Sequence, residues 1–318
     1  MSKFLNISKI LFIISAIFIL YCSTVYAAPA NLQSIAYNLH KKYSIPVKYT
    51  ISTLSAAHFE KSVIDSIKSP KEKVDWYIYK RFFVNKNRIK EGKFFFSKYK
   101  KWLWSSYKRY GVNPKLIAAI LGIESNYGHY KNRYKALNSL YTLAFYYPQR
   151  SAFFRSELKN FIVYTYNYKL NPIKITSSYA GAIGIPQFMP SNILKYAVDF
   201  DNDGKINLDK SIPDAIGSVA NFLKSHGWNG HLFTAIEVNV PANFIHHIDD
   251  DFHTIAYFKK YGVAFTEKCR SGSKAKIIAM QGKYKKEYWA VSKNFYVIKT
   301  YNSSDKYALS AIILSSVL

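Results

Sequence analysis

The stretch Ile117-Ala-Ala-Ile-Leu-Gly-Ile-Glu124 places a carboxylate where a helical pattern expects an apolar side chain. Glu124 lies four residues after Ile120 and three after Leu121, so all three share one face of a helix. Partial burial on that face raises the pKa of the carboxyl, and a position near a helix C-terminus acts in the same direction. Glu124 is therefore a candidate general acid. The alternative is a structural glutamate held by hydrogen bonds at the helix end.

The surrounding chain predicts more helices. Asn113 followed by Pro114 is typical of an N-cap and a first-turn proline, and the helix should run to about Tyr127. Residues 31–110 also have helical spacing of apolar side chains, with a linker at 68–73. Further helices are expected at residues 135–146, 151–168, 191–197, 213–226 and 307–317.

Beyond Trp228 the character of the sequence changes. Short β-branched and aromatic runs predict strands at residues 235–240, 276–280, 288–291 and 295–300. The fold class is therefore α+β and mainly α. We expect an N-terminal segment at 1–27, a helical domain at 28–110, a core at 111–229 that residues 300–318 close, and a small β-containing module at 230–299.

The first residues have the layout of an export signal. Lys3 and Lys9 precede the apolar run 10–20, and cleavage is expected after Ala27. The run is shorter than the ~20 apolar residues of a transmembrane helix, although a retained anchor is the alternative. Lipid attachment at Cys22 is disfavoured, because Tyr21 stands where a small residue is usual. The sequence thus predicts an exported, periplasmic protein.

The net charge indicates the kind of binding partner, and the cysteine content indicates whether a disulfide can form. The formal net charge is +26, and removal of Lys3 and Lys9 with the leader leaves +24. Such a charge indicates a polyanionic partner, and for an exported chain this means the carboxylates and phosphates of the envelope in preference to nucleic acid. An AT-rich genome that inflates lysine is the alternative explanation. Without Cys22 the mature chain would hold Cys269 alone, so no intramolecular disulfide is expected.

A second informative segment is Ser178-Tyr-Ala-Gly-Ala-Ile-Gly-Ile-Pro-Gln-Phe-Met-Pro190. Gly181 and Gly184 allow close backbone approach. The amide of Gln187 offers donors and acceptors of the kind that bind sugar hydroxyl and N-acetyl groups. A buried turn with a capping glutamine is the alternative reading.

In these two segments and in several others, the chain resembles the B-type membrane-bound lytic murein transglycosylases, a glycoside hydrolase family with a lysozyme-like core. The resemblance is dense from Tyr110 to Trp228 and thinner at 76–83 and 294–309. The matching sequence segments lie at residues 122–128, 147–150, 180–184, 187–190, 196–200 and 214–221.

The resemblance implies an activity and a role for Glu124. Glu124 falls on the family's single acid/base, which protonates the oxygen between N-acetylmuramic acid and N-acetylglucosamine and then deprotonates the muramoyl 6-hydroxyl, giving a 1,6-anhydro product. Ordinary glycosidases need two carboxylates. No cofactor is required for this chemistry. A hydrolytic muramidase and a non-catalytic wall-binding protein remain as alternatives.

Substrate contacts follow from the same resemblance. Positions that match residues lining the family's glycan groove are Tyr79, Ser178, Gln187, Tyr301, Asn302 and Tyr307. Arg150 matches one of an arginine pair near the peptide stem, but Gln149 precedes it. Phe153 stands where the family commonly has a tyrosine. The implied partner is the peptidoglycan glycan strand, and peripheral association with the envelope membrane is left open.

The segment from Asp199 to Asn207 opens like a calcium loop. Acids stand at its first, third and fifth positions and glycine at the sixth. The candidate ligands are Asp199, Asp201, Asp203, Lys205 and Asp209. The twelfth position is Lys210 instead of an acid, and the loop length before Asp214 differs from the family by one residue, so an Asx-rich turn is the alternative.

A cluster of histidines and aspartates at residues 246–253 lacks the spacing of a defined metal site. We instead expect its aspartates to cap a helix that begins near Phe252.

Overall fold

The computed structural model describes residues 32–68, 74–130 and 132–318. The expected leader at 1–27, Cys22 and all but the first residue of the expected linker at 68–73 lie outside the described residues. Within these ranges, none of the helices has the length and apolar character needed to span a membrane.

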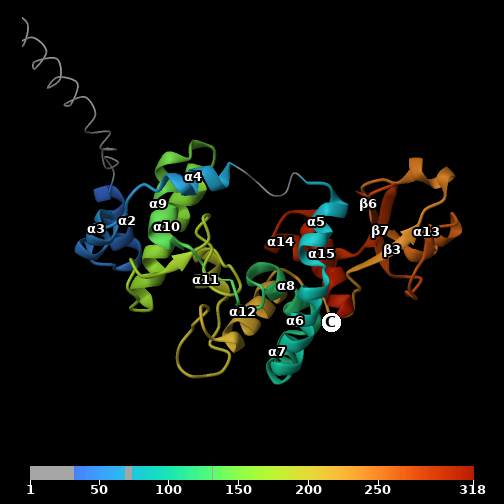
Figure 1. Ribbon diagram of the computed structural model, residues 1–318, viewed down its shortest axis with the longest axis horizontal. Helices are drawn as coiled ribbons and strands as arrows, with labels where there is room; N and C mark the ends of the chain where they lie inside the picture. The colour runs from blue at the N-terminus through green and yellow to red at the C-terminus, as the bar shows by residue number, and fades with distance from the viewer. Residues whose placement is uncertain (1–31, 69–73, 131) are drawn as a thin grey trace, which may run out of the picture.

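The first three helices pack against a later helical pair. α2 (Leu32–Tyr43) and α3 (Val47–Ser55) pack on each other, and α2 contacts α10 (Ser151–Asn167). α4 (Lys61–Ile67) lies against α9 (Ala136–Tyr146). These elements form the end of the molecule on the left in Figure 1.

The next helices lie in the middle of the molecule (Figure 1). α5 (Trp76–Phe83), α6 (Lys86–Lys98) and α7 (Lys100–Tyr110) follow one another, and α6 and α7 pack on α8 (Pro114–Ser125). Asn113 caps α8 as expected, because its side chain accepts a hydrogen bond from Lys115 N. α8 is the most buried helix of this group, and α15 (Asp305–Val317) packs along it.

Short elements connect α8 to the rest of the core. β1 (Tyr134–Lys135) pairs antiparallel with β2 (Thr176–Ser177), and the 3₁₀ turn η2 (Pro148–Arg150) joins α9 to α10. α11 (Pro190–Tyr196) packs on α10 and on α12 (Ile212–Ser225).

A five-stranded antiparallel sheet has the order β4-β6-β7-β3-β5. Its strands are β3 (Ala235–Asn239), β4 (His253–Thr254), β5 (Ala264–Phe265), β6 (Lys274–Gln281) and β7 (Lys286–Val291). η3 (Ala242–His247) and α13 (Ile255–Lys260) cover it and supply Phe244 and Phe258 to a small separate core. The expected β-containing module is thus present (Figure 1, right).

One predicted strand is wrong. Residues 295–300 belong to α14 (Lys293–Tyr301), whose N-cap Ser292 accepts a hydrogen bond from Asn294 N. Phe295 and Ile298 are both buried, which is the three-residue spacing of a helix face. The short apolar run alone could not separate a strand from a buried helix.

Two helix ends also differ from expectation. α8 ends at Ser125, because Asn126 and Tyr127 have positive φ angles of 51° and 59°. The helix expected near Phe252 begins at Ile255, and its cap is the hydroxyl of Thr254 instead of an aspartate.

One large apolar core runs through the helices, from Ile35 in α2 to Leu314 in α15. Because α2 to α4 pack with α9 and α10, whereas α6 and α7 pack on α8 and α5 packs on α15, the N-terminal helices divide between two places in the molecule. The domain boundaries given above stay a prediction.

The helical assignment of α14 has a measurable consequence. Phe295→Ala should lower the free energy of unfolding by about 3–5 kcal/mol, because the ring is fully buried. Tyr296→Ala, at a half-buried position, is the control and should cost less than half as much. Urea unfolding followed by circular dichroism measures both, and equal losses would contradict a helix that buries one face.

Candidate active site

Glu124 lies in the last turn of α8, between the buried side chains of Ile123 and Ser125. Its own side chain is half-buried. Burial raises the pKa of Glu124 from 4.5 to about 7, and the hydrogen bond from Tyr307 partly opposes this rise. The carboxyl group can therefore carry a proton near neutral pH and release it.

Two tyrosines from the C-terminal part of the chain lie near this carboxyl, and one of them is hydrogen-bonded to it. Tyr307 donates its hydroxyl hydrogen to Glu124 Oε1 over 2.6 Å. The ring of Tyr301 lies almost parallel to that of Tyr307, with centroids 6.4 Å apart. Burial, followed by the nearby charge of Glu124, raises the pKa of both phenols well above the usual range. Both hydroxyls thus stay protonated and act as donors.

Contacts with α6 hold the C-terminal end of α8 in place. The guanidinium of Arg88 is buried and donates to Gly122 O, and the hydroxyl of Tyr127 donates to Arg88 O over 3.0 Å. A Cβ atom on Gly122 would lie 2.5 Å from Cζ of Tyr127, so only glycine lets this ring pack there. Sequence reasoning missed Arg88, because nothing in the local pattern of α6 separates a buried arginine from its exposed neighbours.

The segment 178–188 forms a tight loop beside these tyrosines. Ile183 and Phe188 form a β-bridge, and Tyr301 donates to Pro186 O. Gly184 has a φ of 75°, and a Cβ there would lie 2.7 Å from Leu208 O, so the expected close backbone approach is real. The loop is therefore tied directly to the Tyr301–Tyr307–Glu124 cluster.

Two expected groove residues lie in this loop. Gln187 Nε2 donates to Gly184 O over 2.7 Å and to Asn132 Oδ1 over 3.1 Å, which fixes the amide and leaves its carbonyl oxygen outside these two bonds. Ser178 Oγ accepts from Ala182 N over 3.2 Å, so its hydroxyl hydrogen can still be donated. Asn132 was not expected from the sequence.

The other expected groove residues divide into two groups. Tyr79, on α5, is buried and lies close enough to Tyr307 to affect its pKa, so it joins the cluster at Glu124. Asn302 ends α14 and accepts from Ser304 N. Arg150 and Phe153 instead contact each other at the start of α10, with the guanidinium carbon 4.4 Å from the ring centre.

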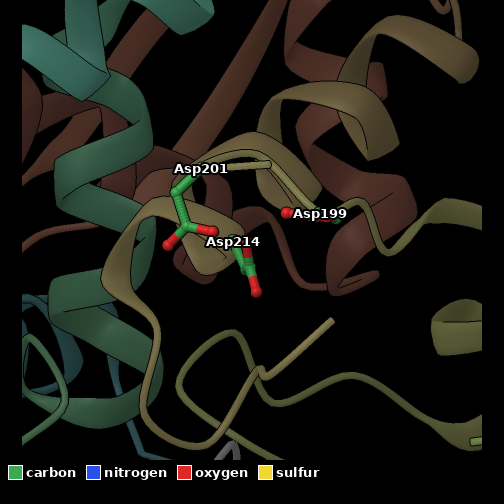
Figure 2. Close-up of side chains that lie close together, drawn as sticks. All are labelled: Asp199, Asp201 and Asp214. Carbon is green, nitrogen blue, oxygen red and sulfur yellow. The ribbon is translucent and has the colours of Figure 1, made fainter. Parts of the chain in front are cut away.

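Three carboxylates gather at the expected calcium loop (Figure 2). Asp199, Asp201 and Asp214 each offer an oxygen, and these oxygens lie within 4.8 Å of one another. One oxygen of Asp201, Oδ1, is buried and has no hydrogen-bond partner among the described residues. Burial, followed in part by the charges of Asp201 and Asp199, raises the pKa of Asp214, whereas hydrogen bonds from Asn207 N and Phe200 N lower it. The donor set suits a hard cation such as Ca²⁺.

The remaining expected ligands lie outside this group of three. Asp203 Oδ1 accepts from Lys205 N within the turn. Asp209 is an exposed residue near Tyr164, and partial desolvation of its carboxyl raises its pKa. The group of three therefore contains Asp214, at the start of α12, and not the predicted ligand Asp209.

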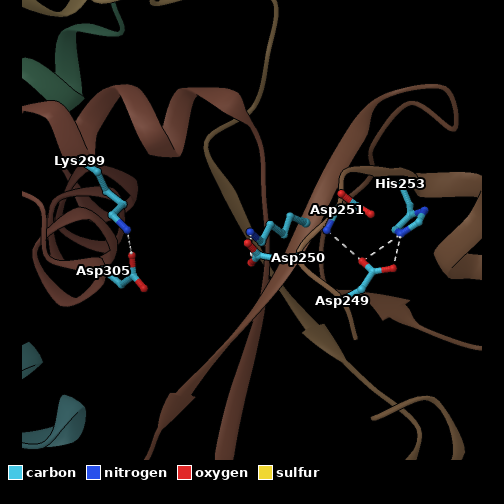
Figure 3. A network of polar contacts seen from close by, with 7 residues as sticks. Asp249, Asp250, Asp251, His253, Lys299 and Asp305 are labelled. Carbon is cyan, nitrogen blue, oxygen red and sulfur yellow. Dashed lines mark hydrogen bonds and ion pairs between the residues drawn. The ribbon is translucent and has the colours of Figure 1, made fainter. Parts of the chain in front are cut away.

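The histidine and aspartate cluster at 246–253 makes ion pairs (Figure 3). Asp249 accepts from His253 over 2.8 Å, and this bond lowers the pKa of the carboxyl. Asp250 pairs with Lys276 on β6. These contacts connect the loop before α13 to its own sheet.

Comparison with known proteins identifies relatives along nearly the whole chain. Residues 28–316 match the family model described as transglycosylase SLT domain. The chain is 33% identical over 235 residues to membrane-bound lytic murein transglycosylase B of Escherichia coli strain K12, a match that covers 74% of this chain and 65% of that protein. The chain thus spans about two thirds of the length of this relative.

Solved structures share the fold. Soluble lytic transglycosylase SltB1 of Pseudomonas aeruginosa has a TM-score of 0.82 at 32% identity, with 90% of this chain and 97% of that chain covered. Escherichia coli lytic transglycosylase Slt35 in complex with calcium has a TM-score of 0.82 at 30% identity, with coverage of 92% and 94%. The expectation of a mainly helical, lysozyme-like fold is confirmed. The chain belongs to the transglycosylase SLT domain family.

Proposed function

We propose that the chain is a lytic transglycosylase of peptidoglycan. It cleaves the β-1,4 bond between N-acetylmuramic acid and N-acetylglucosamine and leaves 1,6-anhydromuramoyl ends. The observation that carries this proposal is Glu124, a carboxyl with a pKa of about 7 that Tyr307 holds at the end of α8. Family membership and the lytic transglycosylases among its relatives support the same reaction.

In the first step Glu124 acts as an acid. Tyr307 donates to Oε1, so we assign the transferable proton to Oε2. Transfer of this proton to the glycosidic oxygen breaks the bond to C1 of the muramoyl residue, and the electron pair leaves with the N-acetylglucosamine oxygen. A pKa near the working pH suits a group that must give up a proton and later regain it.

In the second step Glu124 acts as a base. It removes the proton from the muramoyl 6-hydroxyl as that oxygen bonds to C1, so no water is consumed and the carboxyl returns to its starting form. No carboxylate among the described residues contributes to the pKa of Glu124. A lone carboxyl fits this reaction better than the paired carboxylates of hydrolytic glycosidases.

The groove around Glu124 would bind the glycan through aromatic and amide groups. We assign substrate contacts to Tyr79, Ser178, Gln187, Tyr301, Asn302 and Tyr307. Gln187 is fixed by its two donated bonds, which pre-orients its carbonyl oxygen toward a sugar donor. Arg150, stacked on Phe153, would provide a cation for a stem-peptide carboxylate.

A calcium ion at Asp199, Asp201 and Asp214 is part of the proposal. Three converging carboxylates and the unpartnered Asp201 Oδ1 support it, and the Slt35 structure in complex with calcium supports it further. The ion would join the loop before α12 to the helix start, so its role is structural. We also propose that the protein is exported to the periplasm and contacts the envelope membrane peripherally. Its net positive charge supports this location.

Glu124→Gln should lower the rate of peptidoglycan digestion by about a hundredfold to ten-thousandfold, because it removes the transferable proton. Glu267→Gln, at an exposed glutamate of the sheet module, is the control and should digest normally. Mass spectrometry of the wild-type products should show muropeptides that lack one water. Reducing ends would instead indicate a muramidase, and normal digestion by Glu124→Gln would indicate a non-catalytic binder.

Tyr307→Phe should move the alkaline limb of activity to higher pH. The Tyr307 hydrogen bond lowers the pKa of Glu124, so its removal raises that pKa and keeps the acid protonated to higher pH. The maximal rate should fall at the same time, because the carboxyl loses its anchor. A pH–rate profile on a soluble glycan measures both effects, with Tyr284→Phe as the exposed control. An unmoved limb would show that Tyr307 does not set this pKa.

Calcium should raise the melting temperature of the wild type, because an ion that binds only the folded state stabilises it. Asp201→Asn should abolish this rise, whereas Asp65→Asn on α4 and Asp209→Asn should keep it. Differential scanning fluorimetry with and without calcium decides the point. Loss of the rise in Asp209→Asn but not in Asp201→Asn would contradict the ligand set.

A further inference from the structure

Exposed lysines and aromatic residues follow one side of α6 and α7. They are spaced by three or four residues, which is the spacing of one helix face. The members of this set, called the basic stripe below, are Lys86, Lys90, Phe94, Lys98, Lys101, Trp104 and Lys108, and every one is exposed. Of the two aromatic side chains, Phe94 is 66% exposed and Trp104 is 43% exposed.

The two helices act as a single rod, so the spacing holds across their junction. Tyr99 lies between them, yet its N–H donates to Phe95 O over 2.9 Å and its carbonyl accepts from Leu103 N over 3.0 Å. Figure 1 shows α6 and α7 running one after the other to the lower edge of the view. The seven side chains therefore face the same way.

The opposite side of the rod is buried in the protein. Phe95, Leu103 and Ser106 are among the side chains buried there, and α6 and α7 both contact α8. The lysines and Phe94 of the basic stripe thus lie on the side of the rod away from this buried face. Trp104 is also exposed, and it lines a pocket beside the start of α8.

The charge on this rod is one-sided. Residues 86–110 contain nine lysines and arginines but a single acid, Glu91. Lys98 Nζ lies 5.8 Å from the ring centre of Phe94, so charge and apolar surface are interleaved. Such a surface is complementary to one that offers phosphates at its edge and hydrocarbon just beneath.

We propose that the basic stripe binds the anionic surface of a phospholipid bilayer. The five lysines contact headgroup phosphates through their flexible stems, and Phe94 and Trp104 enter the interfacial layer. An anionic wall polymer would satisfy the lysines but would offer no apolar layer for two large exposed rings. The exposure of Phe94 and Trp104 therefore favours lipid over polymer.

This contact would set the position of the active site. Since α8 packs on the opposite side of the rod, Glu124 would be held one helix layer, about 10 Å, further from the bilayer than α6 and α7. The inference specifies the membrane contact of the proposed function and does not require Glu124 to be catalytic. Its failure can thus be distinguished from failure of the proposed reaction.

The test is co-sedimentation of the full chain with phosphatidylcholine vesicles that contain or lack phosphatidylglycerol. The triple variant Lys90→Gln, Lys98→Gln, Lys101→Gln should weaken binding to the anionic vesicles by at least about tenfold. Phe94→Ser with Trp104→Ser should weaken it by a similar factor. Digestion of soluble glycan strands by both variants should stay at the wild-type rate, which also shows that they fold.

The β6–β7 turn offers a matched control, because Lys283, Tyr284, Lys285 and Lys286 are all exposed. Neutralising its three lysines, or Tyr284→Ser, should leave vesicle binding within about twofold of the wild type. All variants have the same N-terminus, so a difference in vesicle binding between them reflects the basic stripe. Equal losses in the stripe and control variants would overturn the proposal. An unchanged affinity of the aromatic variant, with loss of polyglutamate binding in the lysine variant, would replace it with a polymer-binding face.

Discussion

The hydrogen bond from Tyr307 to Glu124 joins residues 183 positions apart and decides what the site can do. It fixes one carboxylate oxygen, and it brings the first turn of α15 against the last turn of α8. Burial and this bond act in opposite directions on the pKa of Glu124. One pKa unit corresponds to about 1.4 kcal/mol, so burial outweighs the bond by roughly a few kcal/mol in favour of the protonated acid.

Much of the remaining structure keeps these two helix ends together. Arg88 and Tyr127 secure the end of α8 from α6, and Tyr301 connects α14 to the loop that carries Gln187. At the opposite end of the helix pair, Leu116 of α8 and Ser315 of α15 line one pocket, so the helices run antiparallel. The proposed site built this way would have one transferable proton, on Glu124, and otherwise fixed hydrogen-bond donors and acceptors.

Local patterns predicted those features that depend on neighbours in the chain. The apolar stripe before Glu124 predicted its burial, and Asn113 with Pro114 predicted where α8 begins. The short run at Phe295 was ambiguous, because its burial depends on a core that the run itself does not encode. Ser292, which caps α14, was the local signal that favoured a helix.

Features that depend on distant contacts could not be derived from spacing. Arg88 fixes the end of α8 because its guanidinium reaches the carbonyl of Gly122, which is distant in the sequence. The candidate calcium ligands were predicted from positions along the loop, whereas Asp214, at the start of α12, joins the group of three through the fold. Tyr301 and Tyr307 were predicted from the family resemblance alone. The structure shows that Tyr307 bonds to Glu124 and that Tyr301 bonds to the loop that carries Gln187.

The central claim is that Glu124 is a lone acid that titrates near neutral pH. The most direct measurement is carbon NMR of protein labelled at the glutamate side-chain carboxyl, with the Glu124 signal assigned by its loss in Glu124→Gln. The account predicts a titration midpoint at about pH 7. A midpoint near the ordinary value of 4.5 would contradict it, because the carboxyl would then be ionised before it could protonate a glycosidic oxygen.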